Sequence, residues 1–80
     1  MGHRVPTGAE LRELLAVVIT RAAGGKAVRW HERIGPVLEL PLSHDSRCNW
    51  RVEPVCDGME AAIIAKTVEL VRVKHPYIAG

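Results

Sequence analysis

Side chains of the kinds that bind zinc lie between positions 44 and 57. His44, Cys48, Cys56 and Asp57 supply an imidazole, two thiols and a carboxylate. Structural zinc sites are most convincing when their ligands come in C-x-x-C pairs, and no such pair is present here. We therefore interpret these residues as turn residues and small half-buried thiols. A structural zinc bound by the four side chains is the alternative hypothesis.

The two cysteines raise two further hypotheses. On one straight strand their Cα atoms would lie about 26 Å apart, whereas a disulfide needs them within about 7 Å. A bridge therefore requires the chain to turn back near Pro54. Cys48 and His44 would also suit a nucleophile and its base. A thin domain leaves little room for a substrate pocket, so we favour a non-enzymatic role.

Two tryptophans are the only large aromatic residues besides one tyrosine. Trp30 and Trp50 are expected on strands whose apolar sides face the core. Because Trp is enriched at interfaces, one of them is a candidate for an exposed partner-binding surface. A free sheet edge is a second candidate, because it can pair with another copy of the chain.

The length and composition describe an ordinary globular chain. Its 80 residues are 48% hydrophobic and 25% charged, with a net charge of +2, and they predict one domain over 1–80 with a flexible N-terminus over 1–6. The core of so short a chain is thin, which favours a partner. The low cysteine content predicts that the chain is located in a reducing cytoplasm. No apolar run is long enough for a membrane span. The Arg- and Ala-rich composition suggests a bacterial gene.

A helix is predicted from Thr7 to the Gly24-Gly25 pair. Thr7 and Glu10 have the spacing of a capping box, and glycine is typical of helix ends. Apolar residues recur between them at the helical period. They are Leu11, Leu14, Leu15, Val18, Ile19 and Ala22.

Three strands are predicted next. In the first, Val28 and Trp30 alternate with Arg29 and His31. In the second, positions 38, 40 and 42 are leucines on one face. In the third, over 48–53, apolar and polar residues alternate most clearly. Residues 43–46 are expected to form a turn.

A second helix is predicted from Asp57, with Glu60 completing another capping box. Its apolar residues include Met59, Ile63 and Leu70. The β-branched residues over 67–74 suit a strand as well, but no breaker precedes Pro76, so one helix to about Lys74 is favoured.

These elements predict an α+β fold of order α-β-β-β-α, in which a three-stranded antiparallel meander packs against two helices. Double-stranded RNA-binding domains share this order, but they begin their second helix with lysines. Here that helix begins with the acidic Asp57-Gly58-Met59-Glu60, which would repel phosphates. We therefore do not assign the chain to them.

The expected function is that of a small interaction module, self-associating through a sheet edge or a Trp-bearing surface. The alternative is a nucleic-acid-binding domain. Its basic sheet face would carry Arg29, Arg47 and Arg51, and the three should then cluster in space.

Overall fold

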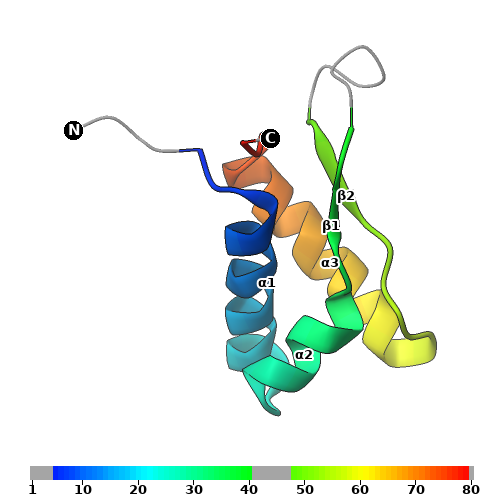
Figure 1. The fold of residues 1–80 in the computed structure, drawn as a ribbon. Coiled ribbons are helices and arrows are strands. Elements are labelled where there is room, and N and C mark those ends of the chain that lie inside the picture. Colours follow the sequence, from blue (N-terminus) through cyan, green and yellow to red (C-terminus); the bar gives the residue numbers. More distant parts are fainter. Residues whose placement is uncertain (1–4, 41–47, 80) are drawn as a thin grey trace.

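A computed structural model describes residues 5–40 and 48–79, and these form three helices and one two-stranded sheet (Figure 1). The predicted three-stranded meander between two helices is therefore wrong. The elements in chain order are α1 (Gly8–Ala23), α2 (Ala27–Ile34), β1 (Val37–Glu39), β2 (Trp50–Val52) and α3 (Gly58–Lys74).

Helix α1 forms as its sequence predicts. The Thr7 amide donates to Glu10 Oε1 at 3.0 Å, and the Glu10 amide donates to Thr7 Oγ1 at 3.1 Å, so the capping box is confirmed. The helix ends at Gly24, whose φ of 84° is costly for any residue with a Cβ atom. Leu11, Leu15 and Ile19 are completely buried.

Helix α2 replaces the first predicted strand. Four alternating residues suit a strand, but Trp30 and Ile34 also lie one helical turn apart, and both are buried. The Trp30 Nε1–H donates to the Gly24 carbonyl at 2.8 Å. This bond ties α2 to the end of α1, and the helix buries Trp30 and Ile34 while it leaves Val28 62% exposed.

The sheet is an antiparallel pair, with Val37 opposite Val52 and Glu39 opposite Trp50. In β2 the predicted alternation is confirmed, since Trp50 is buried and Arg51 is exposed. In β1 it is Val37, not the predicted leucine face, that packs against the core. The predicted turn over 43–46 lies outside the described residues.

Helix α3 runs to Lys74, which confirms one helix over the β-branched segment 67–74. Asp57 is its N-cap, but the Asp57 side chain makes no capping hydrogen bond. Glu60 accepts instead from Arg33 Nη1 of α2 at 2.6 Å. The predicted second capping box is therefore wrong, because Glu60 ties α3 to α2.

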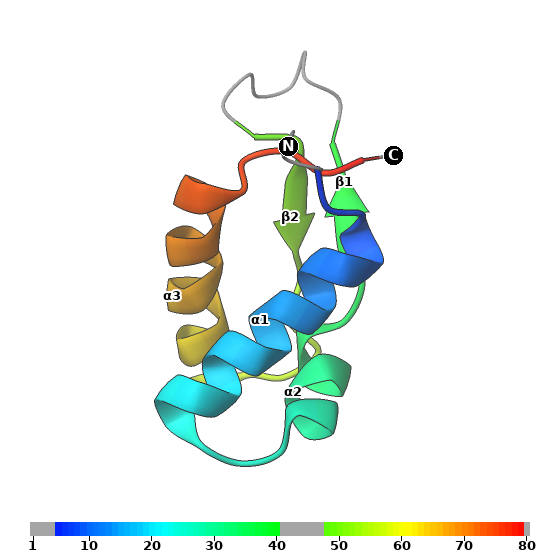
Figure 2. The same ribbon diagram turned by 90° about the vertical axis from the view of Figure 1, so that its left-hand side faces the viewer.

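The core lies where α1, α3 and the hairpin meet (Figure 2). Its fully buried side chains are Leu11, Leu15, Ile19, Ile34, Trp50 and Ile64. Residues 75–79, which follow α3, close one end of this core. The Trp50 Nε1–H donates to the His75 carbonyl at 2.8 Å, the Asn49 amide donates to the Pro76 carbonyl at 3.1 Å, and the Ala79 amide donates to the Pro6 carbonyl at 2.8 Å.

Candidate interaction surface

Both tryptophans belong to the core. Trp30 is 8% exposed and Trp50 is 0% exposed, and each ring N–H donates to a backbone carbonyl. The Arg72 guanidinium lies 5.2 Å from the Trp50 ring centre and covers it further. Neither tryptophan therefore presents a surface to a partner.

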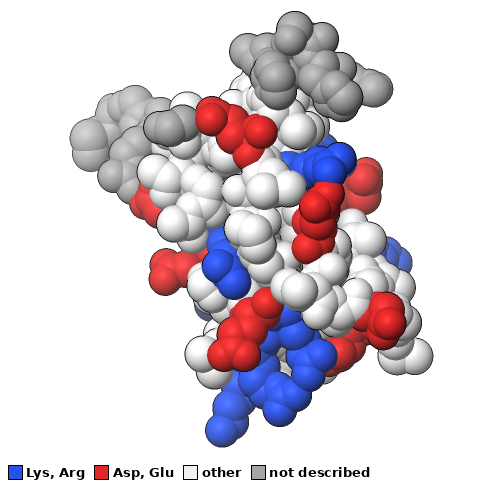
Figure 3. Space-filling view, turned by 45° about the vertical axis from the view of Figure 1, so that its right-hand side comes forward, with Lys and Arg blue, Asp and Glu red and all other residues white. Residues whose placement is uncertain are grey.

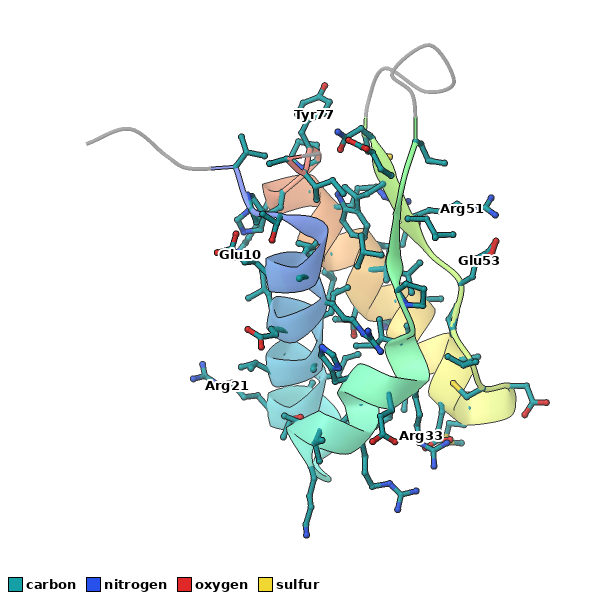
Figure 4. All side chains as sticks on the ribbon, viewed as in Figure 1. Glu10, Arg21, Arg33, Arg51, Glu53 and Tyr77 are labelled. Carbon is teal, nitrogen blue, oxygen red and sulfur yellow. The ribbon has the colours of Figure 1, made fainter. Side chains whose placement is uncertain are left out.

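The arginines expected on one sheet face are on different elements. Arg29 lies on α2, Arg51 lies on β2, and Arg47 is outside the described residues. Arg51 pairs with Glu53 and projects away from the helices (Figure 4). Figure 3 shows acidic side chains among the basic ones on the face that it presents, with the largest basic group at the end where α2 lies. The shared sheet face expected for Arg29 and Arg51 does not exist.

The cysteines are free thiols. Cys48 is buried, with its Sγ atom 3.7 Å from the Trp50 carbonyl oxygen, and Cys56 is half-buried. His44 lies outside the described residues. Within 5–40 and 48–79, no three His, Cys, Asp or Glu side chains come close enough to hold a metal ion.

The environment of Cys56 keeps its thiol protonated. Desolvation raises its pKa above 9.0, and the carboxylates of Glu60 and Asp57 raise it further, whereas Arg33 acts in the opposite direction. Since the thiolate is the nucleophilic form, this position is poorly suited to covalent catalysis.

An apolar groove of about 610 Å³ lies between α1 and α3. Leu14 and Val18 form the α1 wall, and the opposite wall is α3 with the residue that follows it. That wall is Leu70, Val71, Val73, Lys74 and His75. A smaller hollow of about 380 Å³ lies between α1 and α2 and contains Glu13 and His31.

One side of α3 continues the groove outward. Met59, Leu70 and Val73 are 79%, 61% and 83% exposed. With Ile63 and Lys66 they recur at intervals of four, three, four and three residues, so all five follow one line along the helix. We call these five residues the α3 seam.

The predicted apolar face of this helix includes three residues of the seam, Met59, Ile63 and Leu70, and the exposure of Met59 and Leu70 is not what that prediction expects. All three are expected to pack on the sheet, but only Ile63 packs against the core, and it is partly buried. The buried residues of α3 are Ile64, Thr67, Val68 and Val71. Apolar residues on more than one side of a helix were the available signal, because such a helix has a second face to cover.

Comparisons with protein-family models, curated proteins and solved structures return no match. In the part of the chain that the structure describes, no helix is long and apolar enough to cross a membrane.

Proposed function

We propose that this chain is a small, non-enzymatic interaction module that binds a helix of a protein partner on its α1–α3 groove and α3 seam. The observation that carries the proposal is the exposure of Met59, Leu70 and Val73 beside the apolar groove. Contiguous apolar surface is costly in water and marks interaction sites.

The shape of the surface favours a helical partner. A helix binds a groove through apolar side chains on one face, three and four residues apart. The groove between α1 and α3 offers two apolar walls, Leu14 with Val18 and Leu70 with Val73. A third helix laid between those walls would bury both.

Photo-crosslinking tests this surface without assuming the partner. A photoreactive amino acid replaces Val73, and a matched chain carries it at Val28, a valine of α2 that is 62% exposed. Both chains are illuminated in the native cells. We expect a protein adduct from position 73 that Leu70→Glu abolishes, and none from position 28.

Two results would overturn the proposal. One is no protein adduct from position 73. The other is equal adducts from both positions, since these would report random collision and not a binding surface.

A further inference from the structure

We propose that the partner on this surface is a second copy of the chain, with the two α3 helices packed antiparallel across a two-fold axis that lies midway between Lys66 and Leu70. This inference rests on the proposed function, because it uses the same groove and seam. It goes further by naming the occupant.

The spacing of the seam is the first argument. Intervals of four and three residues are those of a helix that packs along another helix with the same repeat. A second copy of α3 has that repeat by necessity, and a two-fold axis brings the same patch of each copy together. A dimer of the chain can therefore cover the α3 seam without another protein.

The charges on this face are the second argument. Lys66 lies on the seam, Glu69 lies three residues later on the same exposed side of α3, and both are exposed. Antiparallel packing places a basic residue of one copy near an acidic residue of the other, twice over. The pair of Lys66 and Glu69 is thus complementary to the same pair in a second copy.

One register of the two α3 helices agrees with both the spacing of the seam and the pairing of the charges. With the axis midway between Lys66 and Leu70 along the helix, Ile63 meets Val73 of the second copy, and the Lys66 stem packs on Leu70 of that copy. The Lys66 ammonium then lies beside Glu69 of the second copy. Leu14 and Val18 of α1 border the same pairing through the groove, so the dimer core contains two helices from each copy.

The size of the surface sets the expected affinity. From Met59 to Val73 the seam runs about 21 Å at 1.5 Å per residue. An interface of that length is at the small end for specific complexes, and we expect a dissociation constant on the order of 10 μM.

Sedimentation of the purified full chain measures the association directly. Between about 0.5 and about 500 μM, a range that brackets this constant, the mass should rise from near 8.8 kDa towards twice that value. Leu70→Glu should keep the chain at 8.8 kDa. Val28→Glu is the matched control, because Leu70 and Val28 are 61% and 62% exposed, and it should associate as the unmodified chain does.

Charge exchange tests the antiparallel register. Lys66→Glu and Glu69→Lys should each weaken association roughly ten-fold, and the double exchange should restore it. Glu69 also pairs with Arg72 at 3.3 Å within the helix. Circular dichroism therefore confirms that each variant keeps its helices.

The possible failures are distinguishable. A chain that stays at 8.8 kDa throughout, or that still associates with Leu70→Glu, overturns the second-copy inference. A position-73 adduct with a different protein would then leave the proposed function standing, whereas no protein adduct would overturn both.

Discussion

Replacing Asn49 with alanine should release the chain end that closes the core. The Asn49 Nδ2–H donates to the Ile78 carbonyl at 3.0 Å, and the Ile78 amide donates to Asn49 Oδ1 at 2.7 Å. Ile78 is 6% exposed and belongs to the core. Asn49→Ala removes both side-chain bonds and keeps the backbone bond to Pro76.

The cost follows from these two bonds. Each contributes about 1 kcal/mol, and polar groups left without partners near the core add to the loss. We expect the free energy of unfolding to fall by about 2 kcal/mol. In a domain of this size the melting temperature should then fall by about 8 to 16 °C.

Urea denaturation measures the free energy, and amide hydrogen exchange locates the loss. Exchange should accelerate first at the amides of Ile78 and Ala79, because their hydrogen bonds hold the end of the chain against the core. Arg51→Ala is the control. It removes an exposed pair with Glu53 and should cost about 0.5 kcal/mol. A loss below about 0.5 kcal/mol for Asn49→Ala would refute the reasoning.

Three further predictions concern the elements around the core. Thr7→Ala removes a cap of α1 and should cost about 1 kcal/mol in urea denaturation; an unchanged midpoint would contradict this. Gly25→Ala should cost about 1 to 2 kcal/mol by the same assay, because φ is 87° and the new Cβ would lie 3.2 Å from Trp30 Nε1; equal stability would refute the strain. The raised pKa of Cys56 predicts alkylation with a midpoint above pH 9.0. Glu60→Gln should lower that midpoint. Because the thiol ionises at a lower pH in the unfolded chain than in the folded chain, the stability that Cys56 contributes is lost as pH rises above 9.0. An alkylation midpoint at or below 9.0 would contradict the raised pKa of Cys56.

The helices at the two ends could be predicted because their signals are local. Thr7 with Glu10, and the glycine pair after α1, specify a helix whatever the rest of the chain does. The limit of α3 at Lys74 likewise depends on the nearby Pro76.

The elements between them depend on distant contacts. Val28 and Trp30 alternate with charged residues, but the bond from Trp30 to Gly24 and the burial of Ile34 favour a helix. The second capping box failed for a similar reason, since Glu60 binds Arg33 from another helix. Neither contact is visible in a local pattern.

The prediction of a third strand also explains why the sequence does not predict the candidate surface. A third strand would have needed both helices to cover one broad sheet, and Met59 and Leu70 were assigned to that contact. The two strands of the described residues leave α3 with fewer neighbours, so these side chains are exposed.

The most direct test of self-association through α3 is a mixture of two single variants. Lys66→Glu makes both residues of the Lys66–Glu69 pair acidic, and Glu69→Lys makes both basic. At about 20 μM we predict that each variant alone is about one quarter dimeric, and that an equal mixture is about half dimeric and approaches the average mass of the unmodified 8.8 kDa chain at that concentration. A mixture that stays monomeric, while the unmodified chain dimerises, would contradict the antiparallel pairing of Lys66 with Glu69.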